Sequence, residues 1–346
     1  MREQGSNMGH FTLKDLAREL GLSVSTVSRA LRDHPGISAK TRERVAALAG
    51  ERSYQPNLIA KSLQTRRTNI IGVIVPEIRH AFFSSVISGI EETANQAGFA
   101  TMICQSHESM DREALHLRAL LSQRVAGVLI SLSKQTRTFE HLREVIRRGV
   151  PLVQFDRTAE ELPTGRVVVD DARGACEAVT HLIKRGYRRI AFLGGLSHVS
   201  ISRRRREGYE KALADHGLPL DEKYIIAGSY HEEDGRRGMR ALLALDDPPD
   251  AVFAVNDPVA VGAFVHLKEH GARIPEDVAL AGFSNNPITA LLDPPLTTVD
   301  QYPFELGREA ALMLLRHFDG SGESGALELK TIKTRLIVRR STAGKE

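Results

Sequence analysis

The sequence predicts a small all-α head followed by an α/β body of two doubly wound, parallel-sheet subdomains, and three observations lead to this prediction. Short amphipathic segments with polar N-cap residues fill positions 12–51. From residue 69 onward, Val/Ile/Leu-rich stretches of strand length alternate with stretches of helix length, which is typical of parallel sheets covered by helices on both faces. This alternating part is too long for one such core and suits two.

Composition excludes several classes of protein. Of the 346 residues 42% are hydrophobic, which is enough to bury real cores and excludes a wholly disordered chain. No apolar run approaches the ~20 residues that cross a bilayer, and residues 1–10 lack the apolar segment of a secretory signal. The two cysteines, Cys104 and Cys176, lie far apart, so no disulfide scaffold is expected. We therefore expect a cytoplasmic protein with no membrane partner.

Positive charge is concentrated near the N-terminus. Residues 1–67 hold 12 Lys/Arg against 6 Asp/Glu, a net charge of +6, whereas the remaining residues hold 35 against 37, a net charge of −2. A basic head on a near-neutral body suits contact with a polyanion. Charge alone is explained equally well by a basic surface that only keeps the protein in solution.

Three N-cap residues mark the helices of the head. Thr12 and Asp15 form a T-x-x-D pattern that resembles a capping box, before a helix that ends at Gly21. Ser23 precedes a second helix over 24–31, and Ser38 precedes a third helix. Three short helices this close together predict a small bundle.

The spacing of Ala17, Gly21 and Val27 indicates a DNA-binding helix-turn-helix. A small residue on the first helix lets the second cross closely, Gly21 makes the turn, and Val27 packs back. The second helix, which would enter the major groove, exposes Val24, Ser25, Ser28, Arg29 and Arg32. Arg29 can reach guanine O6 and N7 through two hydrogen bonds. Hydroxyl groups suited to phosphates belong to Thr12, Ser23, Ser28 and Thr41. The alternative is a generic helical hairpin with hydroxyl caps.

A short, isolated helix is predicted over 57–64. Pro56 suits the first turn, but so short a helix is marginal in water and needs a partner. Leu63 is apolar in a basic linker, and such leucines can wedge between base steps in the minor groove. The alternative is an ordinary linker leucine. The expected DNA contacts of this segment are Asn57, Ala60, Lys61 and Leu63.

The body yields eight predicted strands and a series of helices. The strands are 69–76, 100–105, 127–132, 151–155, 189–194, 224–228, 251–255 and 278–283. The helices include 83–97, 111–123, 138–148, 172–185, 203–216, 258–270 and 304–318. Loops at the carboxyl ends of the strands, facing each other across a cleft, are the expected ligand site.

Several motifs in order resemble the LacI/GalR family of bacterial transcription regulators. They are STVSRAL, ISAKTRERV, YQPN and IAKSL in the first part, with further similarity from NIIGVIVPE to LIVRRST. The resemblance implies a helix-turn-helix, a hinge helix and a sugar-binding core like that of periplasmic binding proteins. It also implies three crossings between subdomains, near 168–170, 299–302 and 328–332. The resulting domains are a tail at 1–11, a head at 12–56, a hinge at 57–67, one core subdomain at 68–169 and 301–330, and another at 170–300 and 331–346.

The sequence carries no recognisable enzyme signature. Gly194-Gly195 follows a strand but does not fit G-x-G-x-x-G, and no P-loop, nucleophile elbow or zinc-protease motif occurs. The run 231–234 (HEED) could suggest a metal, but an acidic helix N-terminus explains it better. We expect no catalytic residue, cofactor or metal. The competing hypotheses are a sugar or sugar-phosphate enzyme with a fused DNA-binding head, and a transport binding protein.

Polar residues at successive strand ends are candidates for holding a small effector. Asp156 and Arg157 follow one strand, Asn256 and Asp257 follow another, and Ser284 and Asn285 follow a third. Sugar hydroxyls need such groups, because a buried hydroxyl is costly to leave unpaired. Phe82 and Phe83 offer an apolar wall for a ring face. The resemblance places effector contacts at Phe82, Phe83, Asp156, Arg205, Asn256 and Ser284, although many relatives carry Asp where this chain has Ser284.

Arg205 belongs to a four-arginine run, 203–206, that opens a predicted helix. A bidentate arginine there would suit a carboxylate or phosphate, so the effector could be a sugar acid or a sugar phosphate. A neutral sugar bound through hydroxyls is equally open.

The resulting hypothesis is a homodimeric repressor of carbohydrate genes on palindromic operator DNA. The operator would carry a flexible pyrimidine–purine step at its centre, where two Leu63 side chains enter. A sugar-type effector would close the cleft and melt the hinge helices. An effector that favours the DNA-binding state would instead be a co-repressor. The sequence leaves open whether the effector lowers or raises DNA affinity.

Overall fold

The computed structural model of the chain describes residues 11–31, 33–52, 54, 68–318 and 328–344. The chain divides into two compact units, Met1–Thr68 and Asn69–Glu346, which are described separately. Several predictions fall outside the described residues and stay predictions: the hinge helix over 57–64 and the DNA contacts of Arg32, Asn57, Ala60, Lys61 and Leu63.

The head contains the three predicted helices, α1 (Leu13–Leu20), α2 (Val24–Ala30) and α3 (Ala39–Glu51). Each begins after the expected N-cap residue. The Thr12 hydroxyl accepts from the Asp15 N–H at 3.3 Å, and Asp15 completes the capping box by accepting from the Thr12 N–H. The hydroxyls of Ser23 and Ser38 cap the other two helices.

The turn between α1 and α2 has the geometry that the spacing predicted. Gly21 lies in the left-handed region, with φ of 64°, which a residue with a Cβ adopts only at a cost. Ala17 and Val27 are buried together with Leu16 and Val45 in one small core. Helix α2 is thereby fixed against α1, with its other side left to solvent.

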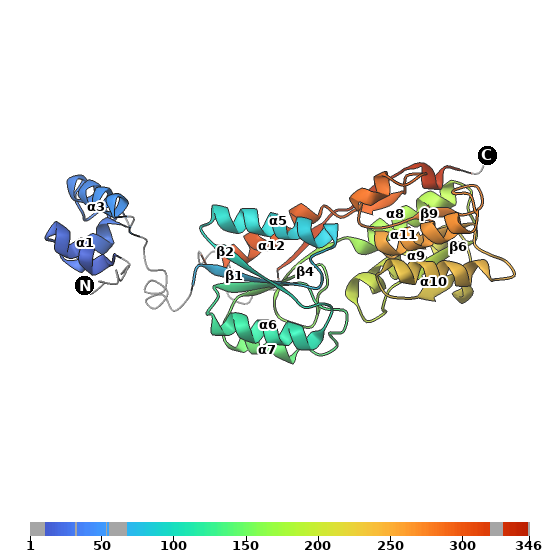
Figure 1. Cartoon of the computed structure of the whole chain (residues 1–346). Helices are drawn as coiled ribbons and strands as arrows, with labels where there is room; N and C mark the ends of the chain where they lie inside the picture. The colour runs from blue at the N-terminus through green and yellow to red at the C-terminus, as the bar shows by residue number, and fades with distance from the viewer. Residues whose placement is uncertain (1–10, 32, 53, 55–67, 319–327, 345–346) are drawn as a thin grey trace, which may run out of the picture. The chain divides into compact units, whose positions relative to one another are not determined.

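The first subdomain of the body is built on a six-stranded parallel sheet. Its order is β11-β5-β4-β3-β1-β2, and the strands are β1 (Ile70–Val75), β2 (Ala100–Gln105), β3 (Gly127–Ile130), β4 (Leu152–Phe155), β5 (Gly165–Val169) and β11 (Leu329–Ile332). Helices α5 (Ala81–Gln96) and α12 (Pro303–Arg316) pack together on one face, and α6 (Met110–Ser122) and α7 (Glu140–Arg147) pack on the other (Figure 1). Separate apolar clusters fill the two faces of this sheet.

The second subdomain repeats this plan on a four-stranded parallel sheet of order β7-β6-β8-β9. Its strands are β6 (Ile190–Gly194), β7 (Ile225–Ala227), β8 (Ala251–Ala254) and β9 (Ala279–Ala281). Helices α8 (Asp171–Lys184) and α9 (Ser200–Asp215) form one packed pair, and α10 (Glu232–Leu243) and α11 (Asp257–Glu269) form the other. An antiparallel pair, β10 (Thr298–Asp300) and β12 (Arg335–Ile337), completes this subdomain. The predicted fold class is confirmed.

The chain crosses between the two sheets three times: between β5 and α8, between β10 and α12, and between β11 and β12. The first two crossings fall at residue 170 and at 301–302. The third falls at 333–334, because Thr331 and Ile332 still pair with Val168 and Val169 of β5. The first core subdomain therefore extends to Ile332, where the sequence had placed its end at residue 330.

All eight predicted strands are present within two residues of their expected bounds, but β5, β10, β11 and β12 were missed. Strand β5 follows β4 with no helix between them, which breaks the strand–helix alternation. Strand β11 lies at a sheet edge, with Leu329, Lys330 and Thr331 exposed, so it lacks the apolar run of a central strand.

Candidate functional site

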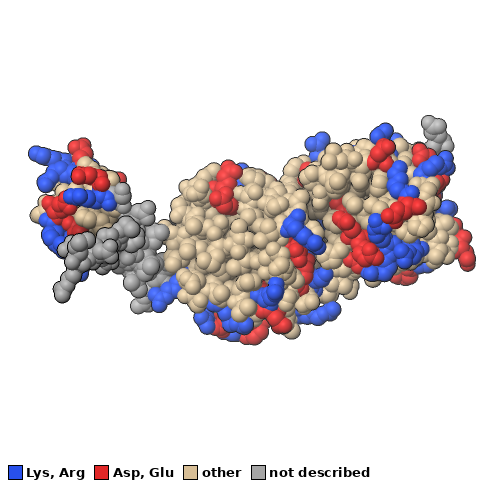
Figure 2. All heavy atoms as spheres, viewed as in Figure 1, with Lys and Arg blue, Asp and Glu red and all other residues tan. Residues whose placement is uncertain are grey.

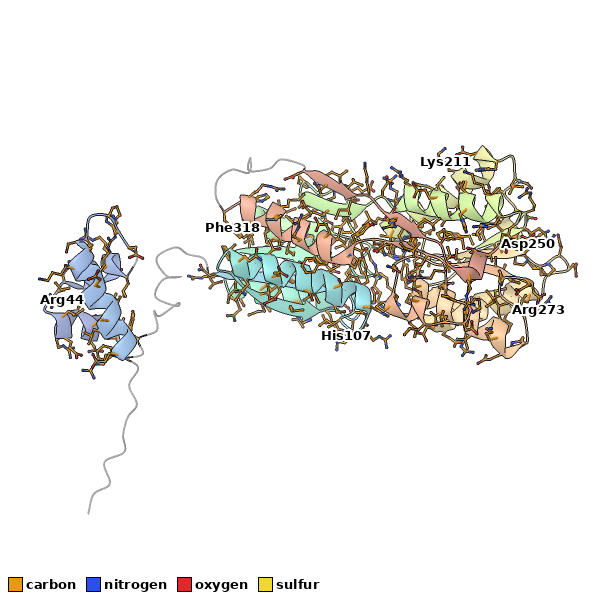
Figure 3. The ribbon with its side chains drawn as sticks, turned by 90° about the horizontal axis from the view of Figure 1, so that it is seen from above. Arg44, His107, Lys211, Asp250, Arg273 and Phe318 are labelled. Atoms are coloured by element: carbon orange, nitrogen blue, oxygen red, sulfur yellow. The ribbon has the colours of Figure 1, made fainter. Side chains whose placement is uncertain are left out.

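A cavity of about 270 Å³ lies between the two subdomains of the body, at the carboxyl ends of their strands. Figure 3 shows His107, just past β2, at the end of the first subdomain that adjoins the second. Asp250, which precedes β8, lies at the far end of the second subdomain in the same view. The carboxyl ends of β2 and β8 thus point toward the boundary. The lining includes His80, Phe82, Phe83, Glu108, Asp156, Arg157, Arg205, Tyr230, Asn256, Ser284, Asn285 and Gln301.

Six of the seven predicted effector residues line this cavity. They come from both subdomains: Phe82, Phe83, Asp156, Arg205, Asn256 and Ser284. The two phenylalanines lie in the first turn of α5, with ring centroids 5.1 Å apart and an edge-to-face arrangement. They form the apolar wall that the sequence suggested, on which the face of a ring can rest.

Asp257, the seventh predicted effector residue, does not line the cavity. Its side chain is fully buried, with one carboxylate oxygen 2.6 Å from the Thr298 hydroxyl and the other 2.7 Å from the Asn286 N–H. Burial raises the pKa of Asp257 to about 6 despite these hydrogen bonds. Adjacent residues at a helix start point in different directions, so a strand end predicts position but not orientation.

Asp156 is a buried carboxylate in a left-handed backbone conformation, with φ of 59°. Such conformations cost free energy and cluster at binding sites. The Ser131 hydroxyl donates to Asp156 at 3.3 Å. Burial raises the pKa of Asp156 to about 6, against the opposing charges of Arg157 and Arg205. This carboxylate can accept hydrogen bonds from an occupant of the cavity.

Arg157, which follows the same predicted strand as Asp156, is the next residue of the cavity wall. Its Nη1 donates to both oxygens of Glu108, at 2.8 and 2.9 Å, and its guanidinium lies over the Tyr230 ring, 4.7 Å from the centroid. Burial opposes ionisation of Glu108, but the Arg157 charge and hydrogen bonds from Arg157 and the Lys134 N–H lower its pKa overall. The Nε of Arg157 is buried and has no hydrogen-bond partner among the described residues. An unsatisfied buried donor in a cavity wall is suited to a ligand acceptor.

Arg205 is fixed by three acceptors. Its Nε donates to Asp171 at 2.7 Å, its Nη1 to the Val255 carbonyl at 2.6 Å, and its Nη2 to the Gln301 side chain at 3.1 Å. The guanidinium also lies 3.8 Å from the centroid of the Phe283 ring. Its charge is therefore already neutralised by a buried carboxylate.

The arginine run does not open a helix, because α9 begins three residues before it, at Ser200. The other three arginines of the run also make ion pairs. Arg203 and Arg204 reach Glu160 of the first subdomain, at 3.4 and 3.1 Å. The run therefore lies within α9 and not at its N-terminus, where the sequence had placed it.

Three further polar residues complete the wall. Gln301 donates to the Ser284 hydroxyl at 2.8 Å. Asn256 caps α11 by accepting from the Val259 N–H, and its amide group donates to the Tyr230 carbonyl at 3.1 Å. Sequence reasoning missed Gln301, Glu108 and Tyr230, which lie in loops without a periodic pattern.

The described residues contain no group of three or more His, Cys, Asp or Glu that could hold a metal ion. His231 is the N-cap residue of α10, and its Nε2 lies 3.1 Å from Lys134 Nζ. The acidic residues that follow lie in the first turn of α10, as the helix interpretation expected. No described helix is long and apolar enough to cross a membrane.

The head leaves most of the predicted DNA-contacting residues accessible. Val24 is 42% exposed, Ser25 and Arg29 are exposed, and Ser28 is half-buried. Arg29 Nε lies 3.3 Å from the Ser25 carbonyl, so its guanidinium rests along α2. The hydroxyls of Thr12, Ser23 and Thr41 also serve the N-caps of the helices. On the face of the described part of the head that is seen in Figure 2, Lys and Arg side chains are interspersed with Asp and Glu.

Two family models match the chain. One, described as bacterial regulatory proteins of the lacI family, matches residues 12–57. The other, described as periplasmic binding proteins and sugar binding domain of the LacI family, matches residues 68–334. The chain belongs to the LacI family. Members of this family bind DNA through the head and an effector through the core, so the chain is a DNA-binding transcription regulator.

Relatives match this LacI-family chain over nearly its whole length. The transcriptional repressor CytR of Escherichia coli is 35% identical, with 96% of each chain covered, and the regulator DegA of Bacillus subtilis is 31% identical, with 96% of this chain and 98% of that protein covered. A solved Lac repressor dimer bound to operator superposes with a TM-score of 0.84 at 26% identity, covering 96% and 98% of the two chains. A CelR–cellobiose complex gives a TM-score of 0.73 at 29% identity, covering 95% and 99%.

Proposed function

We propose that this LacI-family protein is a dimeric repressor whose affinity for a palindromic operator is controlled by a neutral sugar in the cavity. One observation carries the proposal. The cavity wall holds a buried acceptor, Asp156, beside Arg157, whose buried Nε lies 3.9 Å from Asp156 and has no hydrogen-bond partner among the described residues, and an aromatic wall lies next to them. Sugar hydroxyls both donate and accept, and therefore match such a pair.

The charges in and behind the cavity wall favour a neutral effector. Arg205 contacts Asp171, and Arg157 contacts Glu108 at 2.8 Å and lies 3.9 Å from Asp156. Three carboxylates thus face two guanidinium groups. A sugar acid or sugar phosphate would add a further negative charge, while both arginines of the described cavity lining already have carboxylate partners.

Dimerisation is supported by apolar side chains at one edge of the first sheet. Strand β2 is an edge strand, and its Met102 and Ile103 are 36% and 41% exposed. Ile78 and Leu115 add further exposed apolar surface in this subdomain. The face of this subdomain seen in Figure 2 carries few charged side chains. Exposed apolar edges of this kind need cover, which a second copy supplies.

Two heads brought together by a dimer would read two half-sites of a palindrome. We propose that Val24, Ser25, Ser28, Arg29 and Arg32 face bases, that Thr12, Ser23 and Thr41 face phosphates, and that Asn57, Ala60, Lys61 and Leu63 act at a flexible central step. This activity places the protein in the bacterial cytoplasm, on DNA.

Control by the effector is proposed to act through rotation of the two core subdomains. Lys134 of the first subdomain contacts His231 of the second at 3.1 Å, and Glu160 of the first contacts Arg204 of the second at 3.1 Å. A ligand that touches both subdomains favours one arrangement of these contacts. It can shift DNA affinity only by its differential affinity for the two arrangements.

The test uses the full-length protein and an operator selected from random DNA. Operator affinity is followed by fluorescence anisotropy while D-ribose, D-glucose, D-galactose, D-xylose and their acid and phosphate forms are added. We expect at least one neutral sugar to change operator affinity about tenfold, a typical allosteric coupling. Response only to the charged forms, or to none of these compounds, would overturn the proposed effector class. If sedimentation of the protein–operator complex showed one protein chain per operator, the proposed dimer would be overturned.

A further inference from the structure

The loop after β9 brings three residues to the cavity in an unusual backbone shape. Ser284 and Asn285 have φ of 133° and 51°, both in the region that favours glycine. Together with Asn286, they line the cavity. Non-glycine residues keep such conformations only where the surrounding structure holds them. The groups that hold this loop therefore shape the cavity wall.

Arg339, which lies near the C-terminus, holds the loop through side-chain hydrogen bonds. Its Nη2 donates to the Asn285 side-chain oxygen at 2.9 Å, and its Nη1 donates to the Thr289 hydroxyl at 3.1 Å and the Leu296 carbonyl at 2.7 Å. The Asn285 amide group in turn donates to Asp300 at 3.0 Å. One guanidinium thus ties both ends of the segment 285–296 to the C-terminal part of the chain.

Asp257 holds the same loop from the opposite side. Its carboxylate accepts from the Asn286 N–H at 2.7 Å and from the Thr298 hydroxyl at 2.6 Å. The Thr298 hydroxyl also accepts from the Asn285 N–H at 3.2 Å. Gly282 leaves the space that this carboxylate needs, because a Cβ there would collide with it. Asp257 therefore fixes the backbone of the loop without touching the cavity.

The C-terminal segment does not depend on the Arg339 side chain for its own position. The Ser341 hydroxyl donates to the Leu280 carbonyl at 2.6 Å, and the Tyr187 hydroxyl donates to the Ala343 carbonyl at 2.6 Å. The backbone N–H of Arg339 donates to the Thr297 hydroxyl at 2.8 Å. The three guanidinium contacts therefore serve the loop rather than the anchoring of the chain end.

We propose that Arg339 and Asp257 are positioning residues that set effector specificity by holding Ser284 and Asn285 in their cavity-facing conformation. The C-terminal segment thereby becomes part of the effector site without contacting the effector. This inference rests on the proposed function of the cavity.

The test compares full-length Arg339→Met with its neighbour Arg340→Met. Arg340 has a 71% exposed side chain and pairs with the 89% exposed Asp293 at 3.2 Å, so its loss removes the same charge and one solvent-exposed ion pair, but no contact to the cavity-lining residues 284–286. Calorimetry with D-ribose, D-glucose, D-galactose and D-xylose measures affinity. For the sugar that the parent binds most tightly, we expect Arg339→Met to weaken binding about tenfold, as for the loss of a positioned hydrogen-bond group. We also expect the differences in affinity among the four sugars to become smaller in Arg339→Met. Arg340→Met should bind the sugars like the parent.

Hydrogen exchange of the ligand-free proteins separates positioning from general destabilisation. Arg339→Met should accelerate exchange of the amides of 284–291 and leave those of 335–343 as protected as in the parent. Arg339→Lys should restore part of the protection, and Asp257→Asn should reproduce the loop effect. Parent-like affinity and parent-like loop protection in Arg339→Met would overturn the proposal, as would equal loss of protection throughout the second subdomain. If the parent binds none of the four sugars, the sugar assignment fails, and loop exchange alone decides the positioning role.

Discussion

Arg205 donates to Asp171 across 2.7 Å, and this buried ion pair joins the cavity wall to the first residue of α8, where the chain enters the second subdomain. The same guanidinium reaches Gln301 in the second crossing. A cavity residue is thus hydrogen-bonded to one segment that connects the subdomains and to the residue that directly follows another. If an occupant of the cavity displaced Arg205, its hydrogen bonds to these segments would change directly, with no other side chain in between.

Arg205→Met should destabilise the protein strongly, because it leaves the Asp171 carboxylate buried without its cation. Breaking a buried pair from one side costs about 3–5 kcal/mol. Urea denaturation measures the loss. Arg204→Met is the matched control, since its side chain is 47% exposed and such pairs are worth about 1 kcal/mol or less. Equal midpoints for the two variants would show that the Arg205–Asp171 pair does not have this role.

Effector affinity should depend on pH through Asp156. Burial raises the pKa of this carboxyl to about 6, so its proton is lost near that pH in the free protein. Sugar hydroxyls donate to the ionised form, and the bound state therefore has a lower pKa than the free state. Affinity is consequently highest above the free-state pKa and falls as the pH drops through it, by at most about tenfold per pH unit.

Calorimetry between pH 5 and pH 8 checks this dependence. Asp156→Asn cannot ionise, so its weaker binding should be nearly flat over the same range. A parent profile as flat as that of the variant would place the effector away from Asp156.

Arg157→Lys should reduce effector affinity while keeping the fold. A lysine ammonium can still pair with Glu108, but it lacks the buried Nε donor of Arg157, which has no hydrogen-bond partner among the described residues. Hydrogen bonds from charged groups are worth about 1.5–3 kcal/mol, which corresponds to a loss of roughly tenfold or more. Binding is measured by calorimetry and stability by thermal unfolding. Unchanged affinity in a stably folded variant would mean that the Nε donor does not contact the effector.

The sequence predicted the cavity residues best where a strand end determined their place. Asp156, Asn256 and Ser284 each follow a predicted parallel strand, and such ends meet at one edge of a sheet. The same rule failed for Asp257, because it gives the position of the backbone and not the direction of the side chain. Arg205 entered through family resemblance alone.

The position of Arg157 at a strand end was predicted but its role was not, and Gln301 was not recognised at all, because the roles of both residues depend on distant partners. Arg157 looks like a surface cation beside Asp156 until Glu108, which lies in another loop, approaches and neutralises it. Gln301 lies in a crossing segment with no periodic pattern, and its contacts with Arg205 and Ser284 exist only in the folded body. Tertiary packing determines which residues far apart in the sequence become partners, and local sequence propensities carry no information about that packing.

Arg29→Ala should relax the base preference of the operator at one position in each half-site. Arg29 is exposed on α2, and an arginine hydrogen-bonded to guanine O6 and N7 supplies about 1–3 kcal/mol of discrimination against other bases. Binding of the full-length protein to selected operators with single-base changes measures the preference. Arg18→Ala on α1 is the control, because its side chain is 80% exposed and lies near Asp15 rather than on the recognition helix. We expect it to keep every base preference. A parent-like preference at all positions in Arg29→Ala would remove Arg29 from the base-reading set and return that role to the other exposed residues of α2.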